Sequence, residues 1–168
     1  MRRTLSLAAV IITALLLQTT IFADVRLLGA KPELMYLVTI VVAILEGPDS
    51  GAIAGFAGGM SQDFLLDHPK GITALALTLL GYTMGLLRQY IVSPSPILPV
   101  FLVAGGTFAG VLFYGVVAFL LGQLDVGALY LFRVAGLSAA YNAILTPLAY
   151  PVLRRVLAGS RSRKVARW

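Results

Sequence analysis

Cysteine is absent from this 168-residue sequence, and histidine occurs only once, at position 68. Without cysteine the chain can form no disulfide framework and has no thiolate to act as a nucleophile or metal ligand. A transition-metal site needs several nitrogen or sulfur ligands, and the lone His68 stands in a polar link. The phosphate-binding loop and the dinucleotide-binding fingerprint are missing too. We therefore predict neither a metal site nor a cofactor.

Charged residues are also scarce. They make up 12% of the chain, whereas a soluble domain has about 25%. Hydrophobic residues make up 59%, and the mean hydropathy is +0.92. This composition is typical of an integral membrane protein. At about 20 residues per span, the length allows five or six helices and leaves no room for a soluble catalytic domain.

Six apolar segments predict an all-α protein with six transmembrane helices, over residues 4–23, 34–45, 51–66, 72–87, 97–124 and 128–153. The first could also be a signal peptide, but it fills a whole span, so we interpret it as a membrane helix. The second is the shortest. Even over residues 32–46 it would reach only about 22 Å of a ~30 Å hydrocarbon core, which favours a tilted or re-entrant segment.

Breaks between these segments come from glycine, proline and charged residues. A tight turn is expected at residues 47–50, with Asp49 or Ser50 as the N-cap of the next helix. Pro147 and Pro151 are expected to kink the last helix. We predict one transmembrane domain over residues 1–153, followed by a basic tail over residues 154–168.

Six spans place both termini on one side of the membrane, and the basic residues agree with this. Nine would lie on that side: Arg2, Arg3, Arg88, Arg154, Arg155, Arg161, Arg163, Lys164 and Arg167. The other side would have Arg26, Lys31 and Lys70, with Arg133 near the interface. Because cytoplasmic segments carry an excess of Lys and Arg, we expect cytoplasmic termini. The tail has no interleaved aromatics apart from Trp168, so we interpret it as a contact for anionic lipid and not for nucleic acid.

Glycines recur along one face of the third segment and in the fourth. They are Gly47, Gly51, Gly55 and Gly59 at four-residue intervals, Gly58 beside them, and Gly81 and Gly85 further on. Interior glycine costs a helix in water roughly 0.5–1 kcal/mol relative to alanine. In a membrane, bare backbone lets another helix approach closely. Two interpretations stay open: packing within this chain, or docking of a helix from another protein.

The few polar residues of the apolar segments lie mostly near predicted span ends. Asp63 continues the glycine spacing and is expected to pair with Lys70, to cap the next helix, or to contact a partner or small ligand. Arg133 is expected to snorkel to the interface, or to pair with Asp125 or Asp63. Asn142 lies deeper and is expected to make an interhelical hydrogen bond. None of these residues forms a nucleophile–base pair, so we do not predict an enzyme.

An ordered set of residues resembles one protein family. The set is Leu17-Gln18-Thr19-Thr20, Pro32 and Glu33, Glu46-Gly47-Pro48, Gly51, Gly55, Phe56, Gly59, Asp63, Gly71, Ala74-Leu75, Gly81-Tyr82 and Gly85. With its length, six predicted spans and basic C-terminus, the chain resembles the rod shape-determining protein MreD family.

The resemblance implies a non-enzymatic scaffold of the bacterial elongation machinery, located in the bacterial inner membrane. Such a protein would bind the bitopic protein MreC and, through it, connect with RodA, its penicillin-binding transpeptidase partner and the filament protein MreB. The resemblance also implies a fold similar to the six-helix substrate-binding subunits of energy-coupling-factor vitamin transporters. A small-molecule-binding subunit of that kind is therefore the alternative function.

Overall fold

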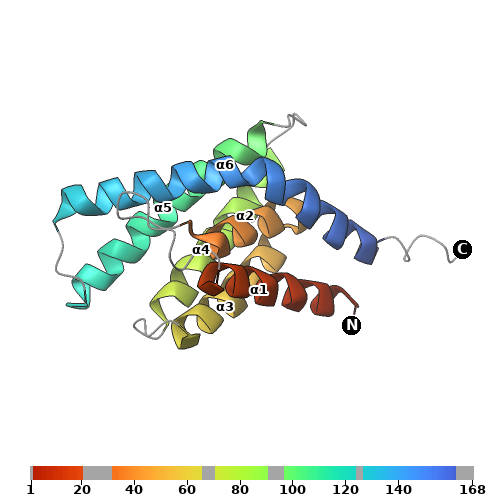
Figure 1. Ribbon diagram of the computed structural model, residues 1–168, viewed down its shortest axis with the longest axis horizontal. Coiled ribbons are helices and arrows are strands. Elements are labelled where there is room, and N and C mark those ends of the chain that lie inside the picture. Colours follow the sequence, from red (N-terminus) through yellow and green to blue (C-terminus); the bar gives the residue numbers. More distant parts are fainter. Residues whose placement is uncertain (1, 21–31, 66–70, 91–96, 124–126, 162–168) are drawn as a thin grey trace, which may run out of the picture.

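The computed structural model describes residues 2–20, 32–65, 71–90, 97–123 and 127–161. Within these ranges it contains six α-helices and no strands (Figure 1). They are α1 (Arg2–Thr20), α2 (Leu34–Glu46), α3 (Pro48–Leu65), α4 (Ile72–Tyr90), α5 (Leu98–Leu120) and α6 (Ala128–Arg161). The prediction of an all-α protein is confirmed for this part of the chain.

Helix α2 forms the centre of the molecule. Every residue from Leu34 to Ala43 is buried, and all five other helices contact it (Figure 1). The sequence of α2 is apolar on every side, as expected of a helix that is surrounded by others. The shortest of the six described helices is therefore the one at the centre of the molecule.

A single residue, Gly47, separates α2 from α3, so the prediction of a turn over residues 47–50 is wrong. The N–H of Gly47 donates to the carbonyl of Ala43 at 2.9 Å, and its own carbonyl accepts from the N–H of Gly51 at 3.0 Å. Its φ of +100° is one that glycine adopts readily. Pro48 then begins α3, at a position where its missing N–H leaves no intrahelical bond unmade. Asp49 consequently lies in the first turn of α3.

Helix α6 continues beyond the apolar segment, which was expected to end at residue 153. It runs to Arg161, and Leu157 is buried in the same core cluster as Leu153. Arginine is a good helix former, so the helix propagates where the hydropathy falls. Pro147 and Pro151 both lie inside α6, which changes direction in its C-terminal half (Figure 1).

The exterior of the helices is apolar, and several polar side chains lie inside. Large exposed side chains include Ile53 and Phe56 on α3, Tyr82 on α4, Phe101 on α5 and Ile144 on α6. The fully buried residues include Thr39, Asp63, Thr107 and Asn142. An apolar exterior of this kind suits hydrocarbon surroundings.

Two of the described helices are long and apolar enough to cross a membrane, judged by length and composition. They are α5 and the Ala128–Ala158 part of α6. The segments Leu5–Thr20, Leu34–Glu46 and Ile72–Arg88 are shorter apolar helices. Crossing by all six helices stays a prediction.

Candidate functional site

The glycine face of α3 is covered by α4 of the same chain. A Cβ atom added at Gly51 would lie 2.5 Å from the carbonyl oxygen of Gly81, and one added at Gly55 would overlap the backbone of Leu77. Gly59 likewise meets the backbone of Ala74, and Gly85 meets that of Pro48, whereas Gly58 meets the side chain of Met35 on α2. The missing side chains therefore let the backbones of α3 and α4 touch.

This packing removes the glycine face from the surface of the molecule. A helix from another protein could reach Gly51, Gly55 or Gly59 only if α4 moved away. Gly47 is different, because no atom lies within 4 Å of an added Cβ. Its role is to connect α2 and α3 with a positive φ. Of the two interpretations of the glycines, the structure supports packing within the chain.

Two other pairs of small residues are open to the exterior. No atom lies within 4 Å of a Cβ added at Gly105 on α5 or at Gly136 on α6. Ala109 and Ala140, four residues further on, are exposed as well. Sequence reasoning missed both pairs, because the spacing shows only when alanine is counted as a small residue and because exposure is not visible in a sequence.

A polar cluster ties the start of α2 to α1 and α3. Oε2 of Glu33 accepts hydrogen bonds from Nε2 of Gln18 at 3.5 Å and from Nε2 of Gln62 at 3.4 Å. Oε1 of Gln18 accepts from the N–H of Met35 at 3.4 Å. The first N–H groups of a helix have no partner within the helix, so this contact satisfies one of them. Sequence reasoning named Gln18 only within the family resemblance and did not name Gln62, although each is an uncharged polar residue in an apolar segment.

Asn142 of α6 joins the same end of α2 to α5. Its Nδ2 donates to the backbone carbonyl of Glu33 at 2.9 Å and to Oγ1 of Thr107 at 3.0 Å. Both Asn142 and Thr107 are fully buried. The deep amide thus connects three helices that are far apart in the sequence.

We expect Asn142→Leu to lower stability by about 1–3 kcal/mol. Leucine fills a similar volume but leaves the carbonyl of Glu33 and the hydroxyl of Thr107 without their common donor. The apparent melting temperature of the detergent-solubilised chain measures the effect. Ala140→Leu, at an exposed position of the same helix, is the control that should leave it unchanged. A melting temperature unaffected by Asn142→Leu would contradict this account.

Asp63 lies near the C-terminal end of α3 and is buried against the start of α4. Its side chain is 0% exposed, and Oδ2 accepts from the N–H of Gly71 at 2.8 Å and from that of Ala74 at 3.2 Å. The carboxylate therefore caps the start of α4. Arg133 is exposed on α6 and is not paired with this buried carboxylate. Two other partners considered for these residues, Lys70 and Asp125, lie outside the described residues, as does His68.

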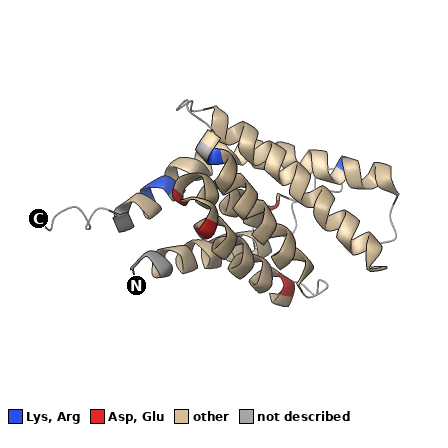
Figure 2. Ribbon diagram, turned by 180° about the vertical axis from the view of Figure 1, so that it is seen from behind, with Lys and Arg blue, Asp and Glu red and all other residues tan. Residues whose placement is uncertain are grey.

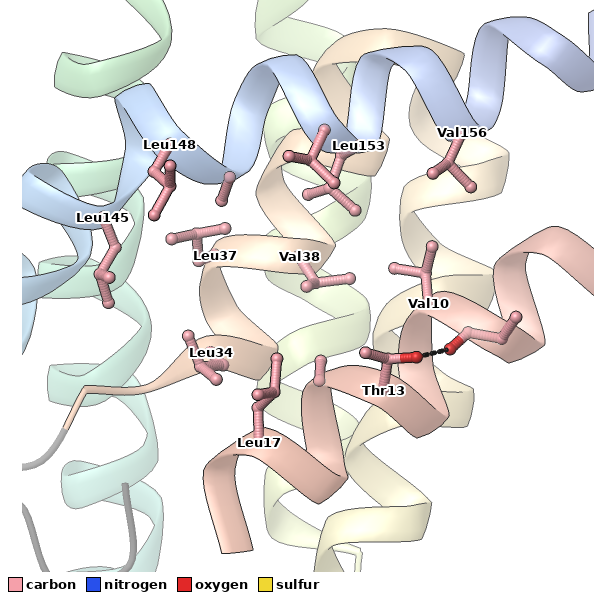
Figure 3. Close-up of a pocket in the computed structure, with 14 residues that line it drawn as sticks. Val10, Thr13, Leu17, Leu34, Leu37, Val38, Leu145, Leu148, Leu153 and Val156 are labelled. Carbon is pink, nitrogen blue, oxygen red and sulfur yellow. Dashed lines mark hydrogen bonds between the residues drawn. The ribbon is translucent and has the colours of Figure 1, made fainter. Parts of the chain in front are cut away.

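An apolar groove lies between α1, α2 and α6 (Figure 3). Its volume is about 520 Å³, and its lining consists of Ala9, Val10, Thr13, Ala14 and Leu17 of α1, Leu34, Leu37 and Val38 of α2, and Leu145, Leu148, Ala149, Val152, Leu153 and Val156 of α6. The hydroxyl of Thr13 donates to the carbonyl of Ala9 at 2.7 Å, so it is satisfied within α1. The lining of the groove is thus apolar, and its residues do not form a set of converging hydrogen-bond donors and acceptors.

Basic residues occur at the end of the molecule where the two termini lie. Figure 2 shows arginine on the C-terminal part of α6, on the side of the molecule where α1 starts. Arg154 and Arg155 are exposed there, and Arg161 is the last residue of the helix. Arg163, Lys164 and Arg167 lie outside the described residues.

Residues 1–157 match the model of a protein family described as rod shape-determining protein MreD. The match extends from α1 almost to the end of α6. No curated protein and no solved structure matches the chain.

Proposed function

This chain belongs to the rod shape-determining protein MreD family, and on that premise we propose that it is a non-enzymatic scaffold of the cell-elongation complex. The family acts in rod-shape determination, as part of the MreBCD shape complex in the inner membrane. Beyond this, the chain would hold the membrane anchor of MreC. Through MreC it would help to organise peptidoglycan synthesis by RodA and its transpeptidase partner, with MreB on the cytoplasmic side.

The proposal includes six membrane crossings with both termini in the cytoplasm. The apolar exterior of α3 to α6 supports it, because exposed Ile, Leu and Phe side chains of this kind suit lipid. The start of α1 and the end of α6 also lie at one end of the molecule, as an even number of crossings requires (Figure 1). Arg154 and Arg155 are exposed on the part of α6 near this same end, in agreement with the positive-inside rule (Figure 2).

We place the contact with MreC on the exposed face of α5 that carries Gly105 and Ala109. Phe101 and Phe113 flank this pair at the same four-residue spacing, with 70% and 39% of their surface exposed. Positions four apart share one helix face, so the pair forms a shallow notch between two aromatic rings. Membrane helices associate by close van der Waals packing at such small residues. The pair on α6 is less suited, because Arg133 lies three residues before Gly136.

We expect Gly105→Leu to reduce co-purification of MreC with the tagged chain by about tenfold, equivalent to ~1.4 kcal/mol. The leucine would fill the notch and hold the partner helix away, while the open space around Gly105 lets the chain fold normally. Gly136→Leu is the matched control, with the same change at an open position of α6. Unchanged recovery of MreC with Gly105→Leu, or an equal loss with both variants, would contradict the proposed contact.

The alternative, a vitamin-binding transporter subunit, needs a pocket in which polar groups fix a small molecule. The groove between α1, α2 and α6 has an apolar lining whose one hydroxyl is already satisfied. This lining favours the scaffold. A vitamin-sized molecule that co-purifies with the solubilised chain would reverse this preference.

A further inference from the structure

The groove between α1, α2 and α6 has the dimensions of a single lipid chain. Its volume of about 520 Å³ corresponds to roughly seventeen groups of ~30 Å³, the size of a water molecule and close to that of a methylene. Along α6 the lining spans residues 145–156, about 16 Å at 1.5 Å per residue. One leaflet of a bilayer contributes half of a ~30 Å hydrocarbon core, or about 15 Å. A membrane-spanning helix would be about twice as long as the groove.

The two ends of the groove differ in charge. Figure 3 shows Leu17 and Leu34 at one end and Val10 and Val156 at the other. The first end lies next to Glu33 in the chain, whose carboxylate accepts hydrogen bonds from Gln18 and Gln62. Arg155 adjoins Val156, so a guanidinium marks the second end.

The helix register brings Arg155 to the rim of the groove. It follows Val152, a lining residue beyond Pro151, by three positions, and positions three apart lie on one side of a helix. Arg155 is exposed. Helix α1 begins at this same end of the molecule (Figure 1). The chemistry here suits an anionic headgroup attached to a hydrocarbon chain.

We propose that the groove binds one acyl chain of an anionic phospholipid, whose phosphate contacts Arg155. The lipid belongs to the leaflet that adjoins both termini. Its chain fills the space between α1 and α6 over the N-terminal part of α2 and so joins the first and last helices of the bundle. This site is separate from the α5 face proposed for MreC.

Native mass spectrometry of the full chain, released from nanodiscs of equal phosphatidylglycerol and phosphatidylethanolamine, tests the proposal. The unmodified chain should retain one phosphatidylglycerol molecule in preference to phosphatidylethanolamine. Arg155→Gln should lower this retention about fivefold, the effect of ~1 kcal/mol for one basic residue at an anionic surface. Ala149→Phe, which puts a ring into the groove, should abolish the retained lipid.

Two matched variants separate this site from general attraction of lipid to the surface. Arg88→Gln removes another exposed arginine, at the end of α4, and Ala140→Phe adds a ring on an exposed part of α6; both should leave retention unchanged. Equal losses with Arg155→Gln and Arg88→Gln, or full retention with Ala149→Phe, would overturn the proposal. The proposal would also be overturned if a polyprenyl phosphate displaced phosphatidylglycerol from the chain in a one-to-one ratio. It would be overturned as well if Ala149→Phe lost MreC binding while it still retained the lipid. The last two results would assign the groove to another occupant.

Discussion

Gly55→Leu is expected to prevent the chain from reaching a stable fold, at a cost of at least about 3 kcal/mol. A Cβ at this position would overlap the carbonyl group of Leu77, which is backbone and cannot rotate away. Helices α3 and α4 would have to separate along their whole contact, and the neighbouring close approach of Gly51 to Gly81 would be lost with it. Overpacking of this kind is more damaging than filling a flexible gap between side chains.

The measurement is the yield of monodisperse protein on size exclusion, together with its apparent melting temperature. Gly105→Leu is the matched control, because it makes the same change where no atom lies within 4 Å of the new Cβ. The control should be recovered in full. If Gly55→Leu were also recovered in full and lost only its binding to MreC, the glycine face would be a partner surface and the packing described here would be wrong.

Asp63→Ala is expected to destabilise the chain by about 2–3 kcal/mol. The substitution removes the acceptor shared by the N–H groups of Gly71 and Ala74 at the start of α4. The site is fully buried, so the two donors would lose a charged partner in the interior. The apparent melting temperature of the solubilised chain should fall accordingly.

Two further substitutions make this prediction specific. Asp63→Asn keeps a side-chain oxygen and should lose less stability than Asp63→Ala. Asp49→Ala removes an exposed aspartate from the first turn of α3 and should cost only about 0.3–1 kcal/mol through the helix dipole. Equal effects of Asp63→Ala and Asp49→Ala would argue against the cap.

Much of the helical framework could be predicted, because apolar segments and the charged or proline-containing links between them mark helices clearly. The predictions were wrong where backbone conformation, helix propensity or burial, and not hydropathy, determines where a helix begins or ends. Gly47 alone reverses the chain because it adopts a positive φ and Pro48 can begin a helix, so a one-residue connection replaces the expected turn. Beyond residue 153, helix propensity and the burial of Leu157 extend α6, although hydropathy falls.

The candidate site was less predictable, because the sequence of one helix does not show which other helix packs against it. The spacing of Gly51, Gly55 and Gly59 suits an internal and an external helix equally well. Gly105 does not belong to such a regular run of glycines. It is nevertheless the α5 glycine at which an added Cβ would meet no atom within 4 Å. The contacts of Gln18 and Gln62 could not be predicted from the sequence, because only the fold brings them to the side chain of Glu33.

The contact between Asn142 and Glu33 has a consequence for biosynthesis, because the two residues are 109 positions apart. At a translation rate of ~5–20 residues per second, Asn142 leaves the ribosome roughly 5–20 s after Glu33. During that interval the carbonyl of Glu33 lacks its final donor, while the hairpin of α3 and α4 can already close. The nascent chain is therefore expected to pass through a stage in which its central helix is held from one side only, and to mature when its last helix is inserted.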